Sequence, residues 1–210
     1  MDEPLGALDK NLREEMQYEI KHIHDQLGVS VVYVTHDQSE ALTMSNRVAV
    51  FDDGVIQQLA APDVLYEEPV NAFVAYFIGE NNRLYGTVKD EDSKMCRVEL
   101  DNAGGDIKAL AVNTDGTGSR TTLSLRPERV KILSESDSAD NVMQGKVEEL
   151  IYLGDHVRTR MTVAGNDQFI VKIPNAHGHP ILHVGDTVKL GWAAEDCRAL
   201  DAPAGGGDPA

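Results

Sequence analysis

The sequence predicts two parts of different fold class, an α/β segment in residues 1–80 and an all-β barrel in residues 81–202. In the first part, stretches with helical spacing of apolar side chains alternate with short, fully apolar runs, as in α/β proteins. The second part is rich in β-branched residues and glycine, and turn signals separate its short runs, which indicates a small closed or partly closed barrel. Residues 203–210 are mostly small residues, proline and glycine, and we expect a disordered tail there.

The chain has 210 residues and a formal net charge of −16. This charge argues against a nucleic-acid partner, because phosphate binding needs clustered Lys and Arg. No apolar stretch approaches the roughly 18–20 residues of a membrane span, and Met1 is followed by Asp2 and Glu3 rather than by an apolar leader. We therefore expect a cytoplasmic protein without direct membrane insertion, in which Cys96 and Cys197 are separate thiols.

The first expected element is a helix over residues 10–27, because apolar residues recur there at intervals of three or four. The apolar stripe consists of Leu12, Met16, Ile20, Ile23 and Leu27. Asp9 is the expected N-cap, and Gly28 is the expected left-handed residue after the helix.

A short apolar run, Val31–Val34, predicts a buried parallel strand. Asp37 and Glu40 form a capping-box pattern that opens a helix ending near Met44. Two strands joined through an Asp-Gly turn are expected next, Arg47–Phe51 and Val55–Leu59.

Two short helices complete the first part. Pro62 suits the first turn of a helix that ends before Pro69, and Asn71 is expected to cap another helix through Ile78. The strands expected for the barrel are Leu84–Lys89, Cys96–Leu100, Ile107–Ala111, Thr122–Leu125, Val130–Ile132, Val142–Ile151, Val157–Val163, Gln168–Ile173 and Thr187–Trp192.

Two places in the first part carry side chains suited to phosphoryl transfer. Asp2 and Glu3 are adjacent carboxylates, of which one can hold Mg²⁺ through water while the other polarises an attacking water. His36 follows shortly after the apolar run, where sites of α/β proteins gather. Each feature alone is common, but together they indicate a catalytic site.

Two longer motifs contain these residues, Asp2-Glu3-Pro4-Leu5-Gly6-Ala7-Leu8-Asp9 and Val31-Val32-Tyr33-Val34-Thr35-His36-Asp37-Gln38. In order and spacing they resemble the C-terminal third of an ABC-transporter ATPase domain. Residues 67–69, 71–75 and 77–81 resemble the end of this domain in importers of the maltose and polyamine class. Within that class, the sequence of these segments is most similar to those of putrescine/spermidine, or related opine, import ATPases.

The resemblance implies roles for individual residues. Asp2 would end the Walker B strand and bind Mg²⁺ through water, and Glu3 would be the catalytic carboxylate. His36 would be the switch histidine that senses the γ-phosphate. Leu5–Asp9 would form the D-loop, in which Asp9 acts across a dimer. The implied fold is a fragment of a P-loop ABC ATPase domain followed by an OB-like accessory barrel of the TOBE type.

The same resemblance implies ATP and Mg²⁺ as cofactors of the intact protein. Its implied partners are a second ATPase subunit, in a homodimer, and the transmembrane permease subunits of the importer. The implied location is the cytoplasmic face of the cell membrane, and the implied role is to energise polyamine import.

Several ATPase motifs are missing from the 210 residues. The only Gly-Lys pair, Gly145-Lys146, does not fit G-x-x-x-x-G-K-S/T, and neither a signature motif nor a glutamine loop is present. We therefore expect a fragment that neither binds MgATP well nor hydrolyses it alone. We also expect residues 1–60 to be rearranged, poorly ordered or buried by oligomerisation, because apolar surface would be uncovered there.

Two other interpretations stay open. The chain could be a stand-alone regulatory barrel that binds an effector and carries an inert ATPase remnant. It could also be an unrelated metal-dependent hydrolase that uses Asp2, Glu3 and His36, which fits the flanking motifs less well.

Two further clusters in the second part invite functional interpretation. His177, His179 and His183 could hold Zn²⁺, but without a nearby Cys or carboxylate we favour a solvated loop. A second cluster could form an anion pocket, although we expect ordinary exposed or ion-paired strand residues instead. Its members are Arg126, Arg129, Arg158 and Arg160.

Overall fold

The computed structural model describes residues 1–102, 105–178 and 180–202, so the expected tail lies outside the described residues. The chain forms two compact units. The N-terminal unit contains residues 1–69 and 77–79, and the C-terminal unit contains residues 70–76 and those from 80 onward. Residues 70–76 thus group with the β-rich part of the chain.

The first helix, α1 (Lys10–Leu27), has the predicted bounds and caps. The Asp9 carboxylate accepts a hydrogen bond from the Leu12 N–H at 3.0 Å. Gly28 has a φ of +63°, and its N–H donates to the His24 carbonyl, which closes the last turn. No residue of α1 is buried, and Leu12, Ile23 and Leu27 of its apolar stripe are exposed, whereas Met16 and Ile20 are partly covered.

The prediction of a buried strand at Val31–Val34 is wrong. Val34 forms a single parallel bridge with Asp2, and residues 31–33 are not in a strand. Val32 is 79% exposed. A buried parallel strand needs hydrogen-bonded neighbours on both sides and covered faces. Within the described residues the backbone of this run bonds only to residues 1–3, and most of its side chains are exposed.

The next elements of the N-terminal unit follow the prediction closely. Helix α2 (Gln38–Met44) is capped by the Asp37 carboxylate, which accepts from the N–H groups of Ser39 and Glu40. The capping box is only half formed, because the Glu40 carboxylate bonds to other side chains instead of returning to the cap.

A hairpin and two short helices follow along the chain, namely β1 (Val48–Asp52), β2 (Val55–Ala60), α3 (Pro62–Glu67) and α4 (Ala72–Phe77), of which α4 groups mainly with the C-terminal unit. The hairpin turns at Asp53 and Gly54, whose φ angles of 48° and 77° suit the Asp-Gly pair. The Asn71 side chain caps α4 by accepting from the Val74 N–H at 2.9 Å, as predicted.

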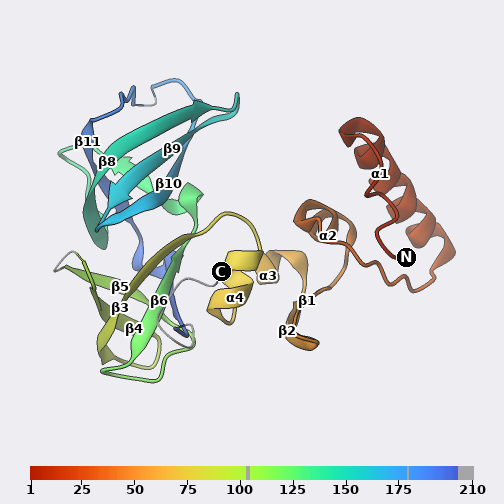
Figure 1. Ribbon diagram of the computed structural model, residues 1–210, viewed down its shortest axis with the longest axis horizontal. Coiled ribbons are helices and arrows are strands. Elements are labelled where there is room, and N and C mark those ends of the chain that lie inside the picture. Colours follow the sequence, from red (N-terminus) through yellow and green to blue (C-terminus); the bar gives the residue numbers. More distant parts are fainter. Residues whose placement is uncertain (103–104, 179, 203–210) are drawn as a thin grey trace. The chain divides into compact units, whose positions relative to one another are not determined.

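The C-terminal unit contains a closed barrel, with strand order β12-β5-β4-β3-β6 (Figure 1). Its strands are β3 (Asn82–Glu91), β4 (Met95–Leu100), β5 (Asp106–Ala111), β6 (Arg120–Leu125) and β12 (Cys197–Leu200). β12 pairs parallel with β5 and antiparallel with β6, which closes the barrel. These findings confirm the predicted barrel, although the sequence did not reveal its last strand.

The remaining strands form a separate five-stranded sheet with the order β10-β9-β8-β11-β7. They are β7 (Lys131–Leu133), β8 (Asn141–Tyr152), β9 (His156–Val163), β10 (Asn166–Pro174) and β11 (Thr187–Trp192). One hydrophobic core contains side chains of both sheets, including Val98 of the barrel and Met161 and Trp192 of the sheet. The nine predicted strands are therefore divided between a barrel and a second sheet.

Two buried asparagines join the barrel to the sheet. Asn82 in β3 donates to the Ile170 carbonyl and accepts from the Ile170 N–H, both at 2.7 Å. Asn141 in β8 makes the same pair of bonds to the backbone of Lys108 in β5, at 2.8 and 2.9 Å. Each amide thus satisfies a backbone donor and acceptor at the junction of the sheets.

Across the described ranges, no helix combines the length and apolar character needed to span a bilayer.

Candidate functional site

The structure brings Glu3 and His36 together, although they are 33 positions apart. The bridge between Asp2 and Val34 aligns the two segments, with the Glu3 N–H donating to the Val34 carbonyl at 2.9 Å. His36 Nδ1 then lies 2.9 Å from Glu3 Oε1. Glu3 has a φ of 43°, a left-handed conformation that costs energy in a residue other than glycine.

The charge of Glu3 changes the chemistry of its neighbour. Its hydrogen bond to the ring, followed by its negative charge, raises the pKa of His36 above the usual value. The protonated ring can donate from Nδ1 to the carboxylate, which both fixes and polarises the pair. Both side chains are exposed, at 77% for His36 and 51% for Glu3, so a ligand can reach them.

The other two predicted site residues are placed differently. Asp2 is adjacent to Glu3 in the chain and is exposed. The Asp9 carboxylate is occupied as the N-cap of α1. Among the described residues, no group of three or more His, Cys, Asp or Glu side chains is arranged to hold a metal ion by itself.

A buried carboxylate behind His36 was missed by the sequence analysis as a possible functional group. Glu40 is 2% exposed, and its Oε2 accepts from Tyr33 Oη at 2.9 Å and from Thr35 Oγ1 at 2.7 Å. Burial, followed by the bond to Glu40, raises the pKa of Tyr33. The capping-box pattern had assigned Glu40 to a helix end, and no local pattern indicates its contacts with residues 33 and 35.

The four arginines of the possible anion pocket each contact protein acceptors, and two of them, Arg126 and Arg158, both bond to Glu80. Arg126 is buried and donates to the carbonyls of Ala75 and Glu80. The other three each face a carboxylate, in the pairs Arg129–Asp196, Arg158–Glu80 and Arg160–Glu149. These three ion pairs agree with the expectation of ordinary exposed or ion-paired residues.

The two cysteines and the predicted histidine loop provide weaker candidates for a functional site than the Glu3–His36 pair. Cys96 and Cys197 are free and buried, as expected for separate thiols, and burial raises the pKa of Cys96 to about 11. Of the possible zinc ligands, His179 lies outside the described residues. His183 faces Asp186, with Nδ1 3.6 Å from the carboxylate.

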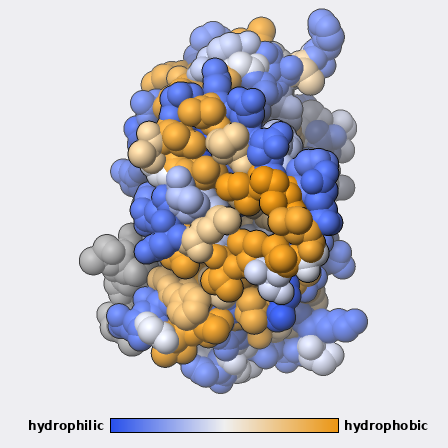
Figure 2. All heavy atoms as spheres, turned by 90° about the vertical axis from the view of Figure 1, so that its right-hand side faces the viewer, coloured by the Kyte–Doolittle hydropathy of each residue, from blue (hydrophilic) through white to orange (hydrophobic). Residues whose placement is uncertain are grey.

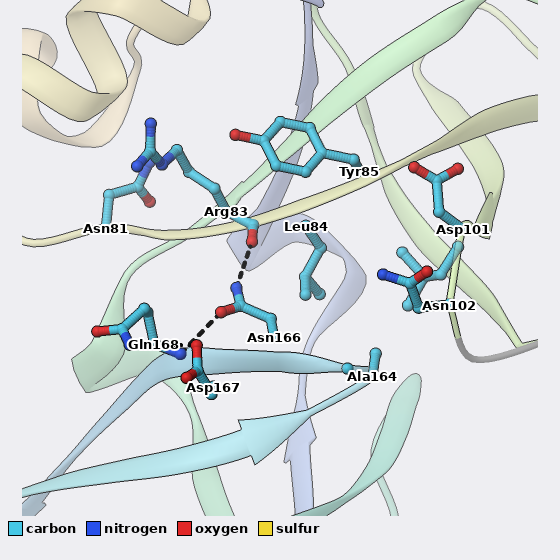
Figure 3. Close-up of a pocket in the computed structure, with 12 residues that line it drawn as sticks. Asn81, Arg83, Leu84, Tyr85, Asp101, Asn102, Ala164, Asn166, Asp167 and Gln168 are labelled. Carbon is cyan, nitrogen blue, oxygen red and sulfur yellow. Dashed lines mark hydrogen bonds between the residues drawn. The ribbon is translucent and has the colours of Figure 1, made fainter. Parts of the chain in front are cut away.

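The C-terminal unit contains a cavity of about 350 Å³ between β3, the turn after β4 and the β9–β10 turn (Figure 3). Its lining is mainly polar and includes Tyr85, Asp101, Asn102, Asn166, Asp167 and Gln168. Asn166 is held in place, because its amide donates to the Arg83 carbonyl and accepts from the Gln168 N–H, both at 2.8 Å (Figure 3). This cavity is the second candidate site.

Comparison with known proteins identifies the class of the C-terminal unit. Residues 123–200 match the TOBE domain, a stretch that contains the sheet strands β7–β11 and the barrel strand β12. This match and the closed barrel confirm the predicted OB-like accessory barrel of the TOBE type.

Particular relatives extend the similarity over nearly the whole chain. The spermidine/putrescine import ATP-binding protein PotA of Rubrobacter xylanophilus is 38% identical over 208 residues, 98% of this chain and 54% of that protein. PotA of Thermobifida fusca is 42% identical over 205 residues, 95% of this chain and 52% of that protein. These matches confirm the resemblance to ATP-binding subunits of polyamine-type importers.

The chain spans about half the length of the curated relatives it matches. Among solved structures, the cytoplasmic molybdate-binding protein ModG with bound molybdate has a TM-score of 0.49 and 15% identity. That similarity covers 57% of this chain and 96% of ModG.

Proposed function

We propose that this chain supplies the carboxylate and histidine part of an ATP-hydrolysing site that drives polyamine import in an ABC transporter. The observation that carries the proposal is the contact of His36 Nδ1 with Glu3 Oε1 at 2.9 Å. The two residues lie in separate motifs of the matched sequence, and only the fold brings them together. The names of the relatives support the cargo class, spermidine and putrescine.

The geometry supports a division of work among the side chains. Glu3 accepts a hydrogen bond from an attacking water and orients it, because a carboxylate offers several acceptor positions and His36 Nδ1 occupies only one of them. His36 offers its second ring nitrogen, Nε2, as a donor to a phosphate oxygen. The exposed carboxylate of Asp2 fits Mg²⁺, which prefers oxygen ligands and keeps several waters. Bound MgATP supplies the electrophilic phosphorus and part of the charge stabilisation.

The partners and location follow from the same class. We propose a homodimer with a second ATPase subunit, in which the Leu5–Asp9 segment contacts the other copy. Permease subunits hold the assembly at the cytoplasmic face of the membrane. Since no G-x-x-x-x-G-K-S/T loop occurs in the 210 residues, the chain alone does not bind MgATP well and does not hydrolyse it.

A chimaera tests this function. The part of the Rubrobacter relative that precedes the matched region is joined to this chain, and Mg²⁺-dependent ATP hydrolysis is measured for the chimaera and for the chain alone. We expect turnover by the chimaera only, with a loss of at least about 100-fold in Glu3→Gln and in His36→Ala. Full turnover in Glu3→Gln, or turnover by the chain alone, would contradict the proposal.

The cargo needs a separate test. The chimaera is expressed in a bacterium that lacks the ATP-binding subunit of its polyamine importer but keeps the permease. Restored uptake of labelled spermidine or putrescine is expected, and Glu3→Gln serves as the inactive control. If ATP hydrolysis is normal but uptake of both polyamines is absent, the assigned cargo is wrong.

The polar cavity favours a second candidate function, effector binding by the C-terminal unit. Its volume of about 350 Å³ suits a small polar molecule, and amides of Asn102 and Asn166 line it. Ligand-observed NMR with a set of small polar metabolites tests this function. A binder that is lost in Asn102→Leu and kept in Asn113→Leu, a change at an exposed residue outside the cavity lining, supports it. Absence of any binder contradicts it.

A further inference from the structure

We propose that Glu40 is a positioning residue that holds His36 beside Glu3. The inference rests on the proposed function for its catalytic meaning, but the contacts that carry it are those of the chain itself. Glu40 is the only polar or charged side chain buried among the described residues of the N-terminal unit. Burying a carboxylate costs free energy unless hydrogen bonds or charges compensate it. The groups bonded to Glu40 therefore indicate which parts of the chain it holds together.

Both oxygens of Glu40 are used. Oε2 accepts from Tyr33 Oη at 2.9 Å and from Thr35 Oγ1 at 2.7 Å. Oε1 lies 3.7 Å from Arg13 Nε, which places a positive charge beside it. The carboxylate is therefore a fixed point between α1, α2 and the segment before His36.

The connection from Glu40 to His36 is short. Thr35 directly precedes His36, and its Oγ1 donates to Glu40 while it accepts from the Asp37 N–H at 3.0 Å. The backbone on both sides of His36 is thus fixed through one hydroxyl. The ring itself is 77% exposed, so surrounding side chains do little to hold it by packing. Its orientation toward Glu3 consequently depends on the backbone, which the Asp2–Val34 bridge aligns with the Glu3 segment and which Glu40 anchors through Thr35.

Arg13 extends the cluster toward the segment that precedes α1. Its Nη1 lies 3.2 Å from the Asp37 carboxylate, and its Nη2 donates to the Leu8 carbonyl at 3.0 Å. The same cluster therefore ties the residues next to His36 to the Leu5–Asp9 segment. A conformational change in that segment would therefore alter the position of His36 through Arg13 and Glu40.

A double-mutant cycle on the full chain tests the inference. Ring ¹⁵N shifts of His36 are measured near pH 5.5, where the ring is protonated, in wild type, Glu3→Gln, Glu40→Gln and the double variant. We expect Glu3→Gln to change the Nδ1 shift clearly in the wild-type background and to have little effect in the Glu40→Gln background. An equal change in both backgrounds would overturn the proposal, because His36 would then reach Glu3 without Glu40.

The cycle separates positioning from charge. Glu3, Asp37 and Glu40 all act on His36 through their charges, and the direct effect of removing Glu40 is subtracted when the two backgrounds are compared. Glu15→Gln, at an exposed position of α1, is the matched control and should leave the Glu3 effect intact.

Thr35→Val keeps the test decisive if Glu40→Gln unfolds the N-terminal unit. This variant removes the hydroxyl between Glu40 and His36 with little change in shape, and we expect the same loss of the Glu3 effect. A normal Glu3 effect in folded Thr35→Val would overturn the proposal. Because no ATP is present, a negative result here is distinct from a failure of the chimaera to hydrolyse ATP.

Discussion

Glu3 Oε1 and His36 Nδ1 lie 2.9 Å apart because a single parallel bridge, between Asp2 and Val34, aligns the two segments that carry them. Neither residue is held by burial. The pair therefore depends on a few hydrogen bonds, which makes its electrostatics measurable by simple substitutions.

The first prediction concerns the pH dependence of this pair. The hydrogen bond and charge of Glu3 raise the pKa of His36 in the folded chain, so protonation of His36 stabilises the folded state. This stabilisation is fully present below the pKa of His36 in the unfolded chain, about 6.5, and is lost as the pH rises through the higher pKa in the folded chain. We expect NMR titration to give a lower His36 pKa in Glu3→Gln than in wild type. An unchanged value would show that the contact does not form in solution.

The second prediction concerns Glu80, which lies between Arg158 and Lys172 at 2.7 and 3.0 Å. Burial raises the pKa of Glu80, but the two hydrogen bonds outweigh this effect and the net shift is downward. The folded-state value is thus below the unfolded one, and the resulting stability is present above about pH 4.3 and lost as the pH falls.

Substitution of Glu80 should accordingly have a pH-dependent effect. Since the side chain is partly exposed, we expect Glu80→Gln to cost about 0.5–1 kcal/mol at pH 7 and less at pH 3. Urea unfolding followed by the fluorescence of Trp192 measures this, with exposed Glu135→Gln as the control. An equal cost at both pH values would argue against the ion pairs.

Local patterns predicted the elements of the chain well. The caps at Asp9, Gly28 and Asn71 depend on single residues in characteristic positions, and all three are confirmed. The strand at Val31–Val34 failed because an apolar run predicts burial only if other parts of the chain cover it. The motifs indicated Glu3 and His36 as functional residues, and their contact is an outcome of the fold.

The contacts that sequence patterns could not reveal are those between distant residues. Glu40 fits a capping box locally, yet its partners are the hydroxyls of Tyr33 and Thr35. Asn82 begins β3, and its role depends on Ile170, 88 positions away. Hydrophobic periodicity and secondary-structure propensity depend on residues that are close together in the sequence. They therefore do not predict contacts between residues that are far apart in it.

The third prediction tests the junction at Asn82. Asn82→Ala would leave the N–H and carbonyl of Ile170 without their side-chain partners in a buried place. We expect a loss of about 2 kcal/mol or more in the free energy of unfolding, because each unsatisfied buried group costs about 1–3 kcal/mol. Asn113→Ala, at an exposed position, should cost little. A similar small effect of both changes would show that water replaces the Asn82 amide.

The fourth prediction uses two glycines of the barrel region. A Cβ on Gly86 would lie 2.6 Å from Val98 Cγ1 and even closer to the Glu99 backbone carbonyl, whereas one on Gly105 would meet nothing within 4 Å. The Glu99 backbone cannot move away easily. We therefore expect Gly86→Ala to lower the free energy of unfolding by about 1–3 kcal/mol or more, measured by thermal unfolding. Gly105→Ala should be nearly neutral. A stable Gly86→Ala variant would require β3 and β4 to separate locally.

The fifth prediction concerns the exposed apolar side chains of the N-terminal unit (Figure 2). Leu27 is 66% exposed and Val32 is 79% exposed, and no residue of α1 is buried. Burying apolar surface contributes about 25 cal/mol per Å², so such surface favours association of copies. We expect sedimentation velocity to show concentration-dependent association, which the double change Leu27→Glu and Val32→Glu weakens. The control is Ile181→Glu, which removes an 81% exposed residue of the C-terminal unit and should leave association unchanged. A monomer at every concentration that binds no apolar dye would show that these side chains do not drive self-association.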